Sequence, residues 1–391
     1  MSLDAVAIVG ITGALGREIQ VALETDPDGI GRFLPIAGAR SAGQSVRWRA
    51  ASLPVMGLGD VAARDIDIAL LACPADVARR EAPRLLHAGA RIIDASGALG
   101  TTPTAAGLDH PATCHWPRIA SSKPDYELAR AFVLPSPIAS TLAPILEAVV
   151  LAALTRAMPI PALQSVEVTA LMGASHAGRD GIGALSRQAV GLLSSQPVLD
   201  PRPFPHGLAF NVIAPSGSDA VVLEARAIDD LVRLIPALGA KPGGPTIAIQ
   251  PLWVPVFSGL ALTITLRFAS PVSVDAVTRA LRSHPDLELA LATENRADAA
   301  NAPVAEARDD GADAEPDASD DLDEDAIDAP DALGLRDTVD RDPVRLNHPV
   351  AGAPHEIRLV AMADTLHRTA LAAQRVLAAW QAALEADEAD A

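Results

Sequence analysis

The chain has 391 residues, a length that suits two domains of about 150 residues each with a remainder. Aliphatic residues dominate and aromatic residues make up 3%, so we expect aliphatic sheets covered by alanine-rich helices, not an aromatic surface for stacking nucleic-acid bases. The formal net charge of −18 also argues against a nucleic-acid partner.

The number of cysteines and the first residues of the sequence indicate the cellular compartment. The two cysteines, Cys73 and Cys114, exclude a disulfide framework and a cysteine-type zinc cluster, and they suit a reducing compartment. The opening MSLDAVAIVG lacks a basic segment followed by a long apolar core, and the chain has no uninterrupted run of about 18 apolar residues. We therefore expect a cytoplasmic protein with no membrane segment and no metal site.

The first third of the chain alternates between strand and helix patterns. A short apolar run at 6–10 ends in glycine, and the apolar spacing of ALGREIQVALE after it predicts a helix. Apolar runs at 33–41, 65–74 and 90–99 predict further strands, and residues 75–90 have a helical pattern. This alternation predicts an α/β domain built on a Rossmann-type, doubly wound parallel sheet.

The pattern changes after Pro137. Residues 140–157 and 180–197 predict helices, the second ended by proline, and residues 163–173 predict a strand. Residues 252–271 have the pattern of a long strand or a hairpin. We expect a second, α+β domain with a mixed or antiparallel sheet and helices on one face.

The C-terminal part begins as a strand at residue 355 and becomes a long amphipathic helix that can return to the first domain. The predicted organisation is a nucleotide-binding domain at 1–136, completed by a helix at about 362–385, and an α+β domain at 137–361.

An acidic stretch interrupts the second domain. From Asp298 to Asp331 there are fourteen Asp and Glu residues against one Arg. Such a segment buries too little apolar surface to offset its ordering entropy, so we predict a disordered insertion at about 297–331. It is either a solvated acidic loop with no function or a docking segment for a basic protein partner.

The turn GITGALG lies where the first strand meets the first helix. Backbone N–H groups of such a turn and the helix N-terminus can hold a pyrophosphate, although a tight turn without a ligand has the same pattern. The predicted nucleotide-binding residues of this turn are Gly10, Thr12, Gly13, Ala14, Leu15 and Gly16.

The end of the second predicted strand indicates which nucleotide would bind. A NAD site usually has Asp or Glu there to accept hydrogen bonds from the ribose 2′-OH, whereas this chain has Arg40 and Ser41. A cation and a hydroxyl suit the 2′-phosphate of NADP, although Arg40 taken alone could be a solvated surface charge.

These motifs resemble those of the aspartate-semialdehyde dehydrogenase family, and the resemblance covers nearly the whole chain outside the acidic segment. The GITGALG turn, the RSAG motif at 40–43 and the region 65–99 are similar to the family's nucleotide-binding domain. Residues 171–185 resemble its serine-glycine-alanine-glycine loop and helix, and VPVFSG at 254–259 and ADTLHRTAL continue the match. The resemblance implies NADP as cofactor and a homodimer built by the α+β domain.

The resemblance also implies a reaction. In the family, a cysteine attacks the aldehyde, the thiohemiacetal gives hydride to NADP, and phosphate cleaves the thioester. The residue that matches this cysteine in SPIAST is Ala139, and Leu260 follows VPVFSG where the family has its acid–base histidine. Trp253 and Gly100 match the family's two anion-binding arginines. The resemblance therefore implies that no catalytic residue is present.

Four other residues are weak candidates for a substrate region: Ser140, His176, Asp230 and Arg233. Asp230 and Arg233 mimic the family's Glu-x-x-Lys pair, but an ordinary surface ion pair explains them equally well.

Neither cysteine is predicted to act as a nucleophile. Cys114 and His115 are adjacent and would point apart in an extended segment, and Cys73 is expected to be a buried apolar thiol.

We expect a member of the family that resembles its non-catalytic, USG-type paralogues: a homodimeric, NADP-binding scaffold without the dehydrogenase reaction. One alternative is an NADP-dependent oxidoreductase with an altered site, acting on an aldehyde or acyl phosphate in amino-acid biosynthesis. The other is an interaction scaffold that works through the acidic insertion.

Overall fold

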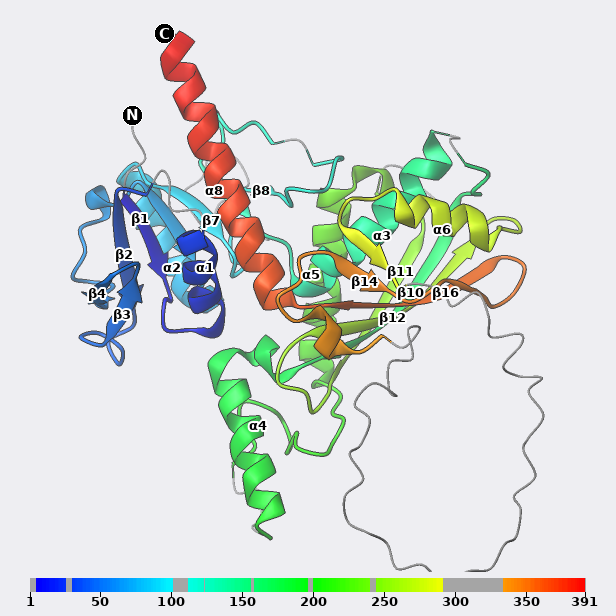
Figure 1. The fold of residues 1–391 in the computed structure, drawn as a ribbon, viewed down its shortest axis with the longest axis horizontal. Coiled ribbons are helices and arrows are strands. Elements are labelled where there is room, and N and C mark those ends of the chain that lie inside the picture. Colours follow the sequence, from blue (N-terminus) through cyan, green and yellow to red (C-terminus); the bar gives the residue numbers. More distant parts are fainter. Residues whose placement is uncertain are drawn as a thin grey trace, which may run out of the picture.

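A computed structural model describes residues 5–25, 30–100, 112–122, 124–155, 158–195, 200–239, 244–290 and 333–390. The predicted acidic insertion at 297–331 lies outside these residues. Two seven-stranded sheets organise the described part of the chain, and the long helix α8 (Thr365–Asp390) runs between them (Figure 1).

The first sheet has the strand order β5-β2-β1-β6-β7-β9-β8, and every neighbouring pair is parallel. Every residue of β1 is buried, because both faces of a parallel sheet are covered. The prediction of a Rossmann-type α/β sheet is thus confirmed. The elements of this part are β1 (Ala5–Val9), α1 (Ala14–Thr25), β2 (Arg32–Ala37), β5 (Met56–Gly57), β6 (Ile68–Leu71), α2 (Ala75–His87), β7 (Arg91–Asp94), β8 (Thr113–Cys114) and β9 (Ala131–Val133), with a separate antiparallel pair, β3 (Ser45–Trp48) and β4 (Ala51–Pro54).

The second sheet is mixed, with the order β11-β10-β12-β16-β14-β13 and β15 paired to β16. Figure 1 shows α3, α5 and α6 lying together along this sheet, as predicted for an α+β domain. Its strands are β10 (Leu163–Met172), β11 (Thr246–Trp253), β12 (Leu260–Phe268), β13 (Leu287–Leu289), β14 (Val344–Leu346), β15 (Val350–Ala351) and β16 (Glu356–Ala363), and its helices are α3 (Pro137–Leu154), α4 (Gly178–Leu193), α5 (Gly217–Leu234) and α6 (Val274–Arg282).

The prediction of one long strand or a hairpin at 252–271 is wrong. The segment contains the end of β11 and all of β12, and β10 lies between these strands. Met172 of β10 is opposite Trp253 on one side and Leu260 on the other. The connection crosses the end of β10, where the Val254 N–H donates to the Met172 carbonyl and the Gly173 N–H donates to the Gly259 carbonyl. Both strands therefore pair with β10 and not with each other.

Helix α3 begins at Pro137, a residue whose fixed φ suits the first turn of a helix. It is long and apolar enough to span a membrane by composition, but 78% of that stretch is buried inside the protein. Helix α3 therefore has the burial of a core helix.

The C-terminal helix α8 packs on α1 beside the first sheet. Trp380 of α8 is fully buried, its ring packs edge-on against Phe132 of β9, and its Nε1–H donates to the Tyr126 carbonyl at 2.8 Å. The last helix of the chain is thereby attached to the first structural unit.

Candidate functional site

The glycine-rich turn between β1 and α1 is tightly packed. Gly10 has a φ of 101°, and a Cβ added there would lie 2.3 Å from the Ala72 carbonyl oxygen. A Cβ at Gly16 would lie 2.2 Å from the Gly10 carbonyl oxygen. Only glycine fits either position, because one requires a left-handed backbone and both allow no side chain.

A cavity of about 1090 Å³ opens beside this turn. One wall is the turn together with Arg40 and Ser41, which follow β2, and the Thr12 hydroxyl donates to the Ser41 hydroxyl at 3.2 Å. The opposite wall is the loop before α4 and the first turns of α4. The N-terminal turn of α8, including Thr365 and Thr369, also lines the cavity, so three segments far apart in sequence meet here.

Most residues predicted to bind a nucleotide meet at this cavity. Its lining includes Thr12, Gly13, Ala14, Leu15, Arg40 and Ser41, and also the weak candidate His176. Gly10 and Gly16 lie behind the lining and shape the turn.

The lining also includes Arg179 and Arg187 of α4, which the sequence analysis did not single out. Cys73, which follows β6, lines the cavity as well, so it is only partly buried and not the buried apolar thiol that was predicted. The two arginines lie in a stretch that resembles the family's loop and helix, so their charge was a signal that could have been used.

Two titratable side chains of the cavity, Cys73 and His176, are poor proton carriers. Burial, with help from the charge of Asp94, raises the pKa of the Cys73 thiol to about 12, so the thiol is protonated at neutral pH. Burial lowers the pKa of His176 to about 4, which keeps its imidazole neutral. The His176 Nδ1 lies 3.2 Å from the Gly173 carbonyl oxygen and donates to it, while Nε2 is buried without a partner among the described residues.

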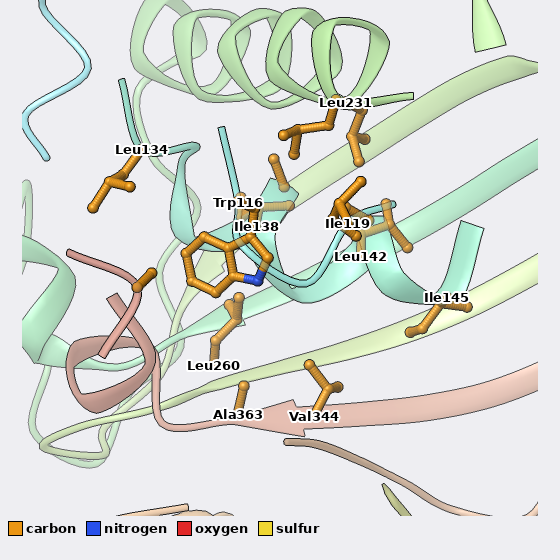
Figure 2. Close-up of a cluster of buried hydrophobic side chains, with 14 of the residues drawn as sticks. Trp116, Ile119, Leu134, Ile138, Leu142, Ile145, Leu231, Leu260, Val344 and Ala363 are labelled. Atoms are coloured by element: carbon orange, nitrogen blue, oxygen red, sulfur yellow. The ribbon is translucent and has the colours of Figure 1, made fainter. Parts of the chain in front are cut away.

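Positions 139 and 260 lie outside the cavity, in the hydrophobic core. Ala139 of α3 and Leu260 of β12 are both 0% exposed and belong to the same buried cluster. Figure 2 shows Leu260 among Trp116, Ile138 and Ala363 in this cluster of hydrophobic side chains. Ser140 is 1% exposed, and its hydroxyl donates to the Pro137 carbonyl. It does not line the cavity.

Trp253 and Gly100 each pack against other groups of the protein. The Trp253 ring packs edge-on against Phe204 at 5.1 Å between ring centroids, in a small cluster at the base of α4. A Cβ added at Gly100 would lie 2.9 Å from Nη1 of Arg233, which donates to the Gly100 carbonyl.

Asp230 and Arg233 do not form the surface ion pair that was considered for them. Asp230 is 4% exposed and accepts a hydrogen bond from the Ser136 N–H at 2.7 Å, and burial raises its pKa. Arg233 instead donates to the carbonyls of Gly100 and Ala112 and lies 3.8 Å from Asp229. Although they are less than one helical turn apart, the two side chains meet different neighbours. Both attach α5 to the first sheet.

Cys114 and His115 point in different directions. The Cys114 thiol lies 4.0 Å from an Asp230 carboxylate oxygen, and burial raises its pKa to about 12. The His115 ring lies against Ser122 and Tyr126. They do not form a thiol–imidazole pair. Among the residues that the structure describes, no group of three or more His, Cys, Asp or Glu side chains could hold a metal ion.

A parallel sheet with a glycine-rich first turn, joined to a mixed-sheet unit across a cavity, defines a two-domain protein of the Rossmann class. Residues 5–125 match the family model for the NAD binding domain of semialdehyde dehydrogenases, and residues 151–309 match the model for their dimerisation domain. The chain belongs to the semialdehyde dehydrogenase family.

The chain is similar to a USG-1 protein homolog of Pseudomonas aeruginosa, with 31% identity over 290 residues that cover 72% of this chain and 79% of the relative. An aspartate-semialdehyde dehydrogenase of a Shewanella species is 23% identical over 288 residues, 73% of this chain and 79% of the relative.

Two solved structures share the fold. A probable aspartate-semialdehyde dehydrogenase from Pseudomonas aeruginosa superposes with a TM-score of 0.73 at 24% identity, covering 95% of this chain and 97% of the other. Aspartate semialdehyde dehydrogenase II from Vibrio cholerae, complexed with ASA, has a TM-score of 0.72 at 19% identity, covering 96% and 98%.

Proposed function

We propose that this protein is a homodimeric, NADP-binding scaffold of its family that does not carry out the dehydrogenase reaction. The observation that carries the proposal is the environment of positions 139 and 260. The two residues that match the family's cysteine and histidine are Ala139 and Leu260, and both are fully buried in an apolar cluster.

These two positions matter because the family's reaction needs a nucleophile at one and a proton carrier at the other. A covalent route through a thioester needs a thiolate that can reach the aldehyde, and the proton transfers need a titratable group beside it. A methyl group and an isobutyl group supply neither. Losing a nucleophile or a positioned proton carrier typically lowers the rate by a factor of about 10² to 10⁶.

Substrate binding is affected as well. The positions matched to the family's two anion-binding arginines hold Trp253 and Gly100, which offer no charge-assisted hydrogen bond to a carboxylate or phosphate. Of the weak candidates for a substrate region, Ser140, Asp230 and Arg233 make hydrogen bonds within the protein.

The cavity beside the glycine-rich turn is the proposed nucleotide site. The Gly13 N–H donates to the Gly10 carbonyl within the turn, so the backbone N–H groups of Ala14 and Leu15 at the start of α1 would hold the pyrophosphate, and Arg40 and Ser41 would bind the 2′-phosphate. NADP, when bound, would bring a nicotinamide ring that can accept a hydride. This chain's own residues would bind and orient the nucleotide without offering a group that reacts.

The homodimer is proposed on the match of residues 151–309 to the family's dimerisation domain. The face of the second sheet that includes Glu167, Thr169 and Gln250 borders a hollow of about 440 Å³ and offers a surface for a second copy. A cytoplasmic location and a basic partner for the acidic insertion remain predictions from the sequence.

A paired binding and activity measurement tests the proposal. NADPH and NADH are titrated into the pure protein, and phosphate-dependent oxidation of aspartate semialdehyde is assayed on the same sample. We expect NADPH to bind more tightly than NADH, Arg40→Ala to remove most of that preference, and turnover to be absent. Turnover like that of ordinary family members would refute the proposal, as would failure to bind either nucleotide.

A further inference from the structure

The cavity beside the glycine-rich turn is cationic in an acidic protein. The charged residues that line it are Arg40, Arg179, Arg187 and one carboxylate, Asp180. The whole chain has 49 Asp and Glu against 31 Lys and Arg. Such a local reversal of sign is the electrostatic pattern of a site for an anionic ligand.

The arginines come from both walls of the cavity. Arg40 follows β2, whereas Arg179 and Arg187 belong to α4 on the opposite wall. The Arg179 guanidinium reaches across and donates from Nη1 to the Thr12 carbonyl at 3.4 Å. This bond is long and exposed, and it uses one of five guanidinium donors, so most donors of Arg179 are free to meet an anion above the turn.

Arg187 has no hydrogen bond and no ion pair within 4.0 Å among the described residues. Hydrogen bonds from Arg202, two from its guanidinium at 2.9 Å each and one from its backbone N–H at 3.1 Å, are what mainly lower the pKa of Asp200, and the charge of Arg187 is the smallest contribution. The Arg187 charge therefore faces the cavity without a committed partner.

The spacing along α4 places these groups on one face of the helix. Arg179, Gly183 and Arg187 are four residues apart, and all three line the cavity. Eight residues of helix separate the two Cα atoms by about 12 Å along the axis, so the two arginines can meet two separate anionic groups of one ligand. Gly183 between them has no side chain, and the Arg187 guanidinium lies over it, with Nη1 3.1 Å from where a Cβ would be.

A buried polar group lies on the same wall. Ser175 is 4% exposed, lines the cavity, and its hydroxyl has no hydrogen-bond partner among the described residues. A buried hydroxyl without a partner is unfavourable, and a ligand that occupies the cavity could supply one.

We infer that Arg179 and Arg187 make α4 a second anion-binding wall, so that a ligand with at least two phosphate groups bridges the two sheet units. One phosphate lies over the glycine-rich turn within reach of Arg179, and another contacts Arg187. The inference rests on the proposed nucleotide site and adds residues from the other unit. It predicts that binding restrains α4 relative to the first sheet.

The test uses the full-length protein and single variants of exposed arginines. Arg179→Ala and Arg187→Ala should each weaken NADPH binding by about tenfold or more, the expected loss for a hydrogen bond to a charged group. Arg187→Lys should recover part of that loss. The control is Arg79→Ala on α2, which removes one exposed positive charge away from the cavity and should leave affinity unchanged. Hydrogen exchange of α4 amides should slow when NADPH binds.

Inorganic pyrophosphate is the second probe and separates the two proposals. Binding of pyrophosphate that depends on Arg179, without NADPH binding, would support the wall and overturn the proposed function. NADPH binding that is unchanged in Arg179→Ala and Arg187→Ala would overturn the wall alone. If neither probe binds, both proposals fail.

Discussion

Ala139, the residue matched to the family's cysteine, lies in the hydrophobic core. It is 0% exposed within α3, and its neighbours Ile138 and Leu142 belong to the same apolar cluster (Figure 2). Restoring a cysteine would place a thiol where water and aldehyde do not reach, and burial raises the pKa of such a thiol.

A thiol at this position is expected to be inert. In an Ala139→Cys variant, the new thiol should resist a water-soluble disulfide reagent in the folded protein and react once the protein is unfolded. Ser186→Cys is the matched control, because Ser186 is exposed and lines the cavity, and it should react at once. Rapid labelling of the folded Ala139→Cys protein would show that the site is open. Adding Leu260→His should not restore turnover.

His115 gives a residue-scale prediction about pH. The Ser122 hydroxyl donates to the Cys114 carbonyl and therefore accepts from His115 Nδ1–H, which leaves His115 Nε2 to accept from the Tyr126 hydroxyl at 2.9 Å. Burial lowers the pKa of His115 from 6.5 to about 4. Between these values the unfolded chain binds a proton that the folded protein does not, so the free energy of unfolding falls as pH is lowered through this window.

The measurement is urea unfolding at pH 7 and pH 5 for wild type and His115→Gln. The wild type should lose on the order of 2 kcal/mol more between the two pH values than the variant, which has no imidazole at this position to titrate. An equal loss in both proteins would mean that His115 is protonated in the folded state as readily as in the unfolded chain.

At the scale of elements, a buried ion pair holds α8 to Asp286, the residue directly before β13. Arg368 of α8 is 0% exposed and donates to Asp286 at 2.7 Å, and Trp116 Nε1–H donates to the same carboxylate at 3.1 Å. The guanidinium also lies 5.4 Å from the Trp116 ring centroid. Three segments meet at this pair.

Breaking the pair should be severe. Asp286→Ala leaves Arg368 charged and buried, and the free energy of unfolding should fall by about 3 to 5 kcal/mol in urea titrations. The double change Asp286→Leu with Arg368→Met should be much milder, because the buried Arg368 charge is removed together with its partner, and Arg118, the other cation at Asp286, keeps its ion pair with Asp342. A double variant as unstable as the single one would show that hydrogen bonds to Trp116 and the backbone, not the charge, carry the stability.

The positions of the helices and strands were largely predictable from the sequence, whereas the order of strands in the sheet and the side-chain partners were not. Apolar runs and helical spacing located β1, α3 and β10 within a few residues, because each pattern is local. The order of β11, β10 and β12 was missed, since alternation in one segment says nothing about which strand enters between its halves. The partners of Asp230 and Arg233 were missed for the same reason.

At the scale of the whole molecule, the cavity combines segments from across the chain. The turn at Gly10 to Gly16 was predictable because its pattern lies within seven residues. The walls formed by Arg187 and Thr365 come from distant segments, and only tertiary packing brings them to the turn. A ligand bound at this site would contact the first sheet's turn, α4 and α8 at once. Such contacts would couple these elements, as the proposed nucleotide-binding scaffold requires.

The most direct test of the central claim is a single-turnover experiment. The protein is mixed in molar excess over aspartate semialdehyde with saturating NADP and phosphate, and reduced nicotinamide is followed by its absorbance. We predict no rise above the protein-free control, in a sample shown separately to bind NADPH. A rise equal to the added aldehyde, however slow, would contradict the account, because it would require a reactive group that Ala139 and Leu260 do not supply.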